Sequence, residues 1–333
     1  MPGDMKVLLV GAGPMAVAYG AVLNALGVSW TVVGRGAASA AKFEAATGMR
    51  PVLGGLASYL ESCPRPLDLA VIVALPIPEL AGAAQILAEA GVGRILLEKP
   101  AGLTVTEVDA VAQAAARTGV QIFVAYNRRF YASVYAAREL IAQDGGVTSF
   151  HMEFTELVDR ILASNKDRTV LSNWFLANST HVIDLAFYLC GQPTQVTGIT
   201  AGELDWHSAG AVFVGHGRTR AGAVFSWHAD WSSAGRWGID IRTPRRRLLL
   251  QPLETLAVQD KGSFSLAPHA IADELDRRYK PGLYREVEAF LSKDPTSTAL
   301  PAIADHFETV RRWFSVICPA VTSLAPLSAA EAG

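Results

Sequence analysis

The sequence has few cysteines, no metal-ligand cluster and no strong excess of charge of either sign. Its three cysteines, Cys63, Cys190 and Cys318, lie far apart and form no even disulfide framework, so we expect reduced core thiols. No group of His, Cys, Asp and Glu has the spacing of metal ligands, and we expect no metal site. A formal net charge of -2 over 333 residues gives no indication of a nucleic-acid partner.

Charge is also absent between Lys6 and Arg35, a run long enough to span a bilayer. Glycine and proline in residues 11–14 divide the run into a strand and a helix, and residues 24–29 divide it again before a second strand. No small-residue cleavage site closes a short apolar segment, which disfavours a signal peptide. We therefore expect no membrane association and a cytoplasmic location.

The same run has the pattern of a dinucleotide-binding unit. An aliphatic strand over residues 7–10 leads into a loop whose glycines let the backbone approach a pyrophosphate. The following helix offers its N-terminal N–H groups to the phosphates, and a small residue allows the helix to pack closely on the strand. The expected cofactor-binding residues here are Gly11, Gly13, Pro14, Met15 and Ala16.

The end of the second strand, residues 30–33, bears on the choice of cofactor. Folds that prefer NAD place an acidic residue here to bind the ribose 2′-hydroxyl, whereas this chain has Gly34 and Arg35. A guanidinium fork fits a 2′-phosphate and can stack on adenine. We therefore expect NADP(H) to be preferred over NAD(H); the alternative is that Arg35 is a solvated surface residue.

The remaining pattern predicts an α/β chain of two domains. Strands and helices alternate at first, which indicates a parallel sheet with helices on both faces. The expected strands are residues 69–73, 94–97 and 121–125, and the expected helices are 37–47, 78–90 and 104–118. After about residue 145 the runs are strand-like, at 147–156, 195–200, 211–214, 221–227, 239–243 and 246–250, with a hairpin turn at 243–246.

We therefore predict an N-terminal Rossmann dinucleotide-binding domain over residues 1–125 and a C-terminal α+β domain over residues 126–318. The second domain should contain a large, mainly antiparallel sheet, whose broad face a helix or a partner subunit would cover. Residues 319–333, rich in Ala, Ser and Pro, are expected to form a flexible tail.

Six short motifs follow one another along the chain. They are residues 11–16, Leu75-Pro76, Glu98-Lys99-Pro100, residues 127–130, residues 181–184 and residues 280–284. In order and spacing they resemble the Gfo/Idh/MocA oxidoreductases, a family named for glucose-fructose oxidoreductase and inositol dehydrogenase, over nearly the full length. The resemblance implies hydride transfer between a nicotinamide cofactor and a sugar, cyclitol or related carbonyl compound, in homodimers or homotetramers. It adds Leu75, Pro76, Glu98, Lys99 and Asn127 to the expected cofactor-binding residues.

Lys99 is the first candidate catalytic residue. It ends a buried strand and precedes Pro100, so its ammonium can point toward a ligand at the strand ends and stabilise negative charge on the reacting oxygen. The family resemblance implies this kind of role. From the residues alone, an ion pair with Glu98 or a surface position is the alternative.

Asn178, His181 and Asp184 form the second candidate group, because a helix from about Ser179 would place them close together. Histidine can exchange a proton with the substrate oxygen near neutral pH, and Asp184 could orient its ring. Alternatively, Asn178 or Ser179 only caps the helix and His181 is a buried structural donor. Many family members carry an aspartate four residues before the histidine, where this chain has Ala177; Asn178 is a hypothetical replacement.

The other expected substrate-binding residues are less specific. The resemblance places Tyr284 near the substrate, and of Arg128 and Arg129 one is expected to bind substrate and the other to form a salt bridge. Trp174 could stack on a sugar ring, as could three further tryptophans, Trp227, Trp231 and Trp237, although core or interface positions are the alternative. The substrate-binding set is Lys99, Arg128, Trp174, Asn178, His181 and Tyr284.

The sequence thus predicts an NADP(H)-dependent oxidoreductase acting on a carbohydrate-like ketone or alcohol, such as a sugar, cyclitol or sugar-nucleotide. Reduction of an imine is a variant of this activity. The alternative, kept open by Ala177, is a catalytically silent cofactor-binding sensor of the same family.

Overall fold

The computed structural model describes residues 6–63, 69–292 and 299–323. The chain divides into two compact units. Unit 1 comprises Met1–Asn127 and Leu275–Phe307, and unit 2 comprises Arg128–Glu274 and Glu308–Gly333. A segment from late in the chain therefore belongs to the same unit as the N-terminal βα repeats.

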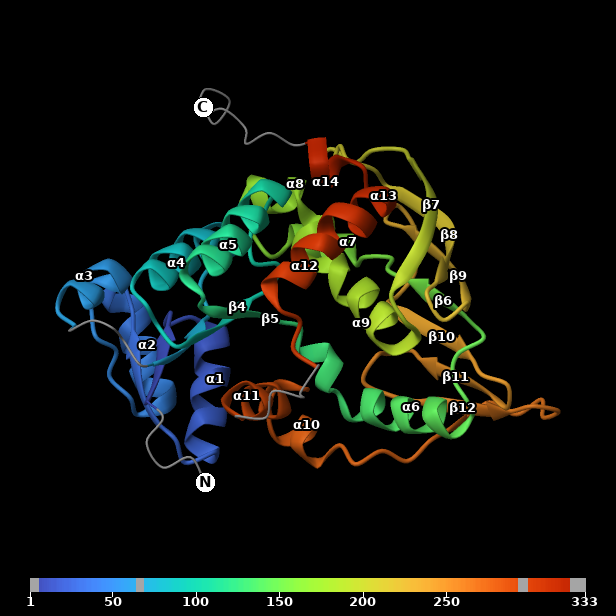
Figure 1. The fold of residues 1–333 in the computed structure, drawn as a ribbon, viewed down its shortest axis with the longest axis horizontal. Helices are drawn as coiled ribbons and strands as arrows, with labels where there is room; N and C mark the ends of the chain where they lie inside the picture. The colour runs from blue at the N-terminus through green and yellow to red at the C-terminus, as the bar shows by residue number, and fades with distance from the viewer. Residues whose placement is uncertain (1–5, 64–68, 293–298, 324–333) are drawn as a thin grey trace. The chain divides into compact units, whose positions relative to one another are not determined.

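Unit 1 is built on a five-stranded parallel sheet with strand order β2-β1-β3-β4-β5. The strands are β1 (Lys6–Val10), β2 (Ser29–Val33), β3 (Ala70–Val73), β4 (Arg94–Glu98) and β5 (Gln121–Ala125). The helices are α1 (Pro14–Ala25), α2 (Ala37–Thr47), α3 (Gly55–Glu61), α4 (Ile77–Glu89), α5 (Val105–Thr118), α10 (Glu274–Arg278), α11 (Leu283–Leu291) and α12 (Ile303–Thr309). Figure 1 shows α4 and α5 on one side of this sheet and α1 with α11 on the other, so both faces are covered.

The Rossmann fold expected for this part of the chain is confirmed. All five expected strands are present to within one residue at each end, because their aliphatic runs are nearly continuous and buried. Helix α3 was not expected. It begins after Gly54, which like Gly55 has a positive φ, and such a glycine pair is typical of a loop in sequence.

Unit 2 is built on an eight-stranded sheet with strand order β13-β12-β11-β10-β6-β9-β8-β7 (Figure 1). Only β6 and β9 run parallel among the paired strands described, so the expectation of a mainly antiparallel sheet is confirmed. The strands are β6 (Ser149–Glu153), β7 (Pro193–Ala201), β8 (Val212–Thr219), β9 (Val224–Asp230), β10 (Gly238–Arg242), β11 (Arg246–Leu250), β12 (Ala257–Asp260) and β13 (Ala267–Pro268). Strands β12 and β13 were not expected, because they are short and largely outside the core.

The helical segments of unit 2 lie mainly on one side of its sheet. They are η1 (Asn127–Phe130), α6 (Ala132–Gln143), α7 (Val158–Leu162), α8 (Arg168–Ser172), η2 (Phe175–Ser179), α9 (Thr180–Cys190), η3 (Val310–Phe314), α13 (Ser315–Ile317) and α14 (Ala320–Ser323). Helix α9 is almost completely buried and packs on the sheet, with the Phe187 and Phe225 rings 5.6 Å apart. The register places Ile199 of β7 and Val224 of β9 on the opposite face, where they are 67% and 48% exposed.

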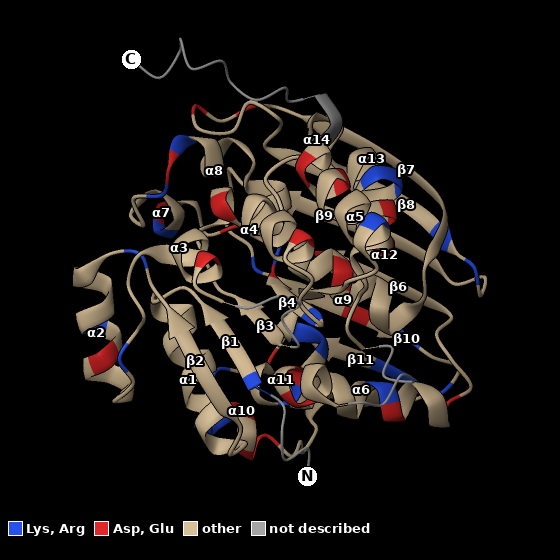
Figure 2. Ribbon diagram, turned by 60° about the vertical axis from the view of Figure 1, so that its left-hand side comes forward, with Lys and Arg blue, Asp and Glu red and all other residues tan. Residues whose placement is uncertain are grey.

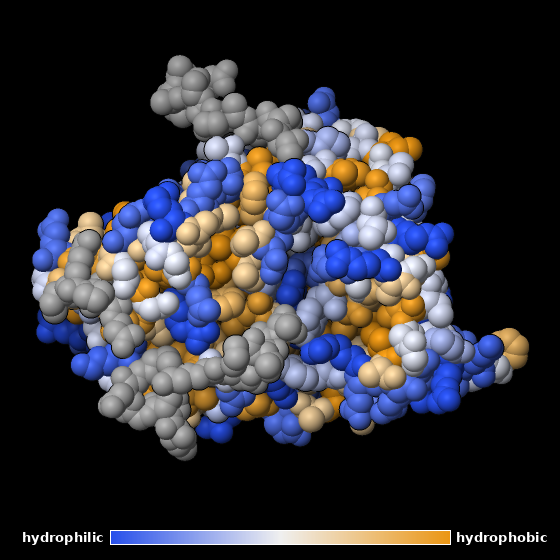
Figure 3. Space-filling view, in the orientation of Figure 1, coloured by the Kyte–Doolittle hydropathy of each residue, from blue (hydrophilic) through white to orange (hydrophobic). Residues whose placement is uncertain are grey.

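Cys190 and Cys318 are buried free thiols, as expected, and Cys63 is half-buried. On the face shown in Figure 3, hydrophobic residues are visible between hydrophilic ones. In the parts of the chain that are described, no helix has both the length and the apolar character needed to cross a bilayer. Of the tail expected over 319–333, residues 324–333 lie outside the described residues.

Candidate active site

The loop between β1 and α1 depends on glycine at its first position. Gly11 has a φ of 118°, and its N–H donates to the carbonyl of Val33 at 2.9 Å. A Cβ atom on Gly11 would lie 2.3 Å from the carbonyl oxygen of Ala74, which follows β3. Only glycine fits this backbone, so the loop turns tightly at the carboxyl end of the sheet.

Gly13 has a different role, because a Cβ atom there would meet nothing within 4 Å. It is the N-cap of α1, and no side chain caps the helix. Pro14 opens the helix, and no acidic residue lies in its first turn. The open space over the loop and the uncapped positive end of α1 fit the phosphates of a dinucleotide.

Arg35 follows β2 and forms a two-point ion pair with Glu79 in the first turn of α4. Both nitrogen-to-oxygen distances are 3.1 Å, and the arginine side chain is 75% exposed. Leu75 and Pro76 immediately precede α4, so the pair brings Arg35 beside this loop. Such an exposed pair contributes roughly 0–1 kcal/mol, little enough for a ligand phosphate to compete with Glu79.

Lys99 lies directly after β4 and is half-buried, with a cis peptide bond to Pro100. In the same unit, Asn127 donates from Nδ2 to the carbonyl of Pro281 at 2.9 Å. Lys280 Nζ lies 2.6 Å from Sδ of Met15 in the nucleotide loop. The segment around Lys280 therefore joins the expected cofactor residues Met15 and Asn127 within unit 1.

Tyr19, Glu98 and Glu286 form a buried acid cluster next to Lys99, at the end of β4. The hydroxyl of Tyr19, in α1, donates to Glu98 Oε1 at 2.8 Å. Burial raises the pKa of Glu98, against the opposing effects of the Lys99 charge and the Tyr19 hydrogen bond. Burial, and then the charge of Glu98, raise the pKa of Glu286 well above its usual value. Both effects favour the protonated form of the Glu286 carboxyl group.

Glu286 was missed by the sequence reasoning, although the sequence carries a signal for it. Leu283, Val287, Phe290 and Leu291 are the buried apolar residues of α11, and Glu286 is buried among them with 0% exposure. A carboxyl group among apolar residues at helical spacing marks a buried acid.

His181 and Asn178 come together in unit 2, with a carboxylate that was not expected. His181 lies in the first turn of α9, is 4% exposed, and has its ring 6.2 Å from that of Trp237. Asn178 donates from Nδ2 to both carboxylate oxygens of Glu156, each at 3.2 Å, and Ser179 Oγ donates to Glu156 Oε1 at 2.6 Å. The loop after β6 thus supplies a carboxylate beside Asn178, where position 177 has only a buried methyl group.

The alternative in which Asn178 or Ser179 caps α9 through its side chain is not observed, because the π-helical turn η2 runs directly into α9 and no side-chain cap bond forms. Asp184 pairs with Arg129, whose Nε donates to Oδ2 at 2.7 Å, instead of with the ring of His181. Both side chains of this pair are buried. Of the two neighbouring arginines, Arg129 is therefore the one that forms a salt bridge.

Arg128 instead lines a cavity of about 470 Å³ in unit 2, together with Trp174, Trp237 and Glu156. Its guanidinium carbon lies 4.8 Å from the centroid of the Trp237 ring.

The other expected substrate-binding aromatic residues lie elsewhere. Trp227 and Trp231 are core residues. Tyr284 belongs to unit 1, at the start of α11, with its ring 5.3 Å from that of Tyr279.

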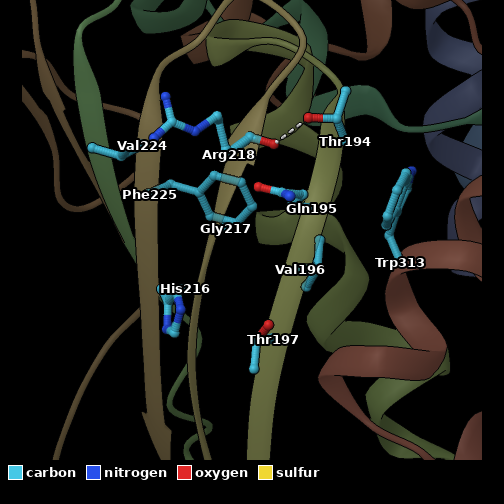
Figure 4. Close-up of a pocket in the computed structure, with 10 residues that line it drawn as sticks. All are labelled: Thr194, Gln195, Val196, Thr197, His216, Gly217, Arg218, Val224, Phe225 and Trp313. Atoms are coloured by element: carbon cyan, nitrogen blue, oxygen red, sulfur yellow. Dashed lines mark hydrogen bonds between the residues drawn. The ribbon is translucent and has the colours of Figure 1, made fainter.

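A cavity of about 580 Å³ elsewhere in unit 2 contains none of the expected site residues. Figure 4 shows Trp313 facing strand β7 across it, with Arg218 and Phe225 on the other side of that strand. Within the described chain no group of three His, Cys, Asp or Glu residues could hold a metal ion.

Comparison with known proteins identifies the N-terminal domain. Residues 5–126 match the model of an oxidoreductase family with an NAD-binding Rossmann fold, the Gfo/Idh/MocA family. A search of curated proteins finds no match to this chain.

Solved structures resemble nearly the whole chain. The UDP-N-acetylglucosamine 3-dehydrogenase GnnA from Acidithiobacillus ferrooxidans has a TM-score of 0.70 and 17% identity, covering 96% of this chain and 97% of that chain. The WlbA dehydrogenase from Bordetella pertussis, in complex with NADH and UDP-GlcNAcA, has a TM-score of 0.70 and 18% identity, with the same coverage. A levoglucosan dehydrogenase in complex with NADH and L-sorbose has a TM-score of 0.67 and 20% identity, covering 91% and 93%. At these identities the likeness shows a shared two-domain fold.

Proposed function

We propose that this protein, whose residues 5–126 match the model of an oxidoreductase family with an NAD-binding Rossmann fold, transfers a hydride between NADP(H) and a hydroxyl or carbonyl group of a carbohydrate-like substrate. The observation that carries the proposal is the convergence in unit 1 of the glycine loop, Arg35 and Lys99 at the carboxyl ends of parallel strands. Two structural relatives are named as dehydrogenases of sugar compounds, and one was solved with a uridine sugar-nucleotide, which supports this substrate class.

Lys99 and His181 are the proposed catalytic residues. The bound cofactor would supply or accept the hydride. The ammonium of Lys99 would donate a hydrogen bond to the reacting oxygen and stabilise its developing negative charge. His181, in unit 2, would exchange a proton with the substrate, and its ring is held in place by packing against Trp237.

Glu156 is the proposed positioning residue for Asn178. Its carboxylate accepts two hydrogen bonds from the Asn178 amide, which leaves the amide oxygen to accept a hydrogen bond from a substrate hydroxyl. A carboxylate from the loop after β6 would thus compensate for Ala177. This observation favours an active enzyme over a silent sensor.

The preference for NADP(H) rests on Arg35. Replacing Arg35 by alanine should weaken binding of NADPH by at least about tenfold and binding of NADH much less, because only NADPH carries the 2′-phosphate. Glu79→Gln, which frees the guanidinium, should strengthen NADPH binding. Both effects are measured by titrating the quenching of tryptophan fluorescence. Tighter binding of NADH than of NADPH by the parent protein would contradict the preference.

The direct test of the mechanism is turnover by a Lys99→Ala variant. Loss of a contact made in the transition state should lower kcat by at least about a hundredfold. Lys42→Ala, an exposed lysine of α2, is the matched control and should leave kcat unchanged. Equal turnover by the parent and the Lys99 variant would remove Lys99 from the mechanism.

A further inference from the structure

The cavity of about 470 Å³ in unit 2 is unusually basic. Four of its lining residues carry positive charge: Arg128, Arg160, Lys166 and Arg236. They come from four places in the sequence, namely η1, helix α7, the segment before α8, and the loop before β10. Figure 2 shows basic positions on α7 and on the segment that leads to α8. The fold therefore collects these cations around one space.

Among the residues that the structure describes, no carboxylate forms an ion pair with any of these four side chains. The carboxylates that line the cavity are Glu156 and Glu254, which leaves two more positive than negative groups. Glu156 already accepts hydrogen bonds from Asn178 and Ser179. The donors of the four basic side chains are thus available to an anion.

The cavity is also connected to the candidate catalytic residues of unit 2. Trp237 lines it and contacts the ring of His181, and Glu156 lines it and holds Asn178. The guanidinium of Arg128 rests against the Trp237 ring, which fixes the arginine without using its N–H donors. Trp174, only 8% exposed, adds a second indole to the lining. A volume of this size fits a sugar with a charged substituent.

We propose that this cavity binds a phosphorylated sugar, with Arg128, Arg160 and Arg236 on the phosphate oxygens and the sugar ring against Trp237. The inference rests on the proposed function and specifies its substrate class. A phosphate ester carries roughly -1.5 to -2 charge and three acceptor oxygens, which suits several separate cations better than the single charge of a carboxylate. The basic rim also attracts such a ligand from solution, so binding weakens as salt increases.

The test measures binding by calorimetry to the NADP(H)-saturated protein, with four probes: glucose 6-phosphate, UDP-glucose, glucuronate and glucose. At least one phosphorylated probe should bind about tenfold or more tightly than glucose and glucuronate. The double variant Arg160→Gln/Arg236→Gln should lose at least about tenfold in affinity for that probe. The matched control, Arg218→Gln/Arg220→Gln, removes two exposed arginines of the β8–β9 hairpin and should bind as the parent does.

Equal affinity for glucose and the phosphorylated probes, tighter binding of glucuronate, or unchanged binding in the Arg160/Arg236 variant would each overturn the proposal. Because Arg160 and Arg236 are exposed, their replacement should leave the thermal midpoint unchanged, so a loss of affinity is not a loss of folding. The readout needs no turnover. Phosphate-dependent binding without hydride transfer would contradict the proposed function but not this inference. Turnover of a neutral sugar without phosphate-dependent binding would contradict this inference but not the proposed function.

Discussion

Asp184 and Arg129 form a buried ion pair whose loss should be costly. Replacing Asp184 by asparagine leaves the Arg129 charge buried without its partner, which should lower the free energy of unfolding by about 3–5 kcal/mol. Glu308→Gln breaks the exposed pair with Arg311, which solvent screens, and should leave the free energy of unfolding nearly unchanged. Urea denaturation measures both. A small effect in Asp184→Asn, with a large loss of activity, would restore Asp184 to an orienting role on His181.

Glu286 should make stability depend on pH. Its folded pKa is raised well above the usual value, so the folded state holds a proton that the unfolded state loses above about pH 4.5. Stability contributed by this group is therefore full below that pH and is lost as the pH rises toward the folded pKa. Glu98 shifts in the same direction, so part of the dependence remains when Glu286 is replaced.

Glu286→Gln keeps the shape of the side chain and removes its titration. The variant should lose less stability than the parent between pH 5 and pH 8, as measured by thermal denaturation across this range. Glu288→Gln, an exposed position on the same helix, is the control and should follow the parent. Parallel curves for the Glu286 variant and the parent would show that Glu286 is ionised in the folded protein.

At the scale of elements, replacing the two glycines of the β1–α1 loop should have different effects, one on stability and the other on cofactor binding. Gly11→Ala forces a Cβ atom against the Ala74 carbonyl at a positive φ and should destabilise unit 1 by more than about 1 kcal/mol. Gly13→Ala meets no protein atom and should fold normally, but its methyl group occupies the space over the loop and should weaken cofactor binding. Denaturation and cofactor titration separate the two. Normal cofactor affinity in Gly13→Ala would place the phosphates elsewhere.

Elements with a strong local pattern are those the sequence predicts. The strands of unit 1 are aliphatic runs bounded by turns, and helix α2 was expected at its observed bounds, Ala37–Thr47. The π-helical turn η2 could not be foreseen, because it changes only the hydrogen-bond spacing of a segment that joins α9. Prediction from sequence thus reached the strands and helices of the fold, and not the local geometry of this turn.

The same limit applies to the site residues. Lys99, His181 and the glycine loop carry local motifs, so the sequence proposes them as candidates. It does not propose Glu156, because the significance of Glu156 depends on contact with Asn178, 22 positions away. The basic lining of the unit 2 cavity depends likewise on residues brought together from separate loops.

At the scale of the whole molecule, we propose that a second copy of the chain covers the open face of the unit 2 sheet. Ile199 and Val224 are the exposed apolar residues of this face, and an oligomer would bury them. Ile199→Glu/Val224→Glu should shift the mass measured by light scattering to that of a monomer. Leu53→Glu, at an apolar position of unit 1 that is 49% exposed, should not change the mass. A monomeric parent protein would contradict this assembly.

The central claim, that the molecule is an enzyme and not a cofactor-binding sensor, is tested most directly by NADPH consumption. The parent protein is mixed with NADPH and a panel of phosphorylated keto-sugars, and the near-ultraviolet absorbance of the reduced nicotinamide is followed. We predict a substrate-dependent loss of absorbance with at least one compound, abolished in Lys99→Ala. Tight binding of NADPH and of a phosphorylated sugar, with no loss of absorbance in either direction of the reaction, would contradict the claim.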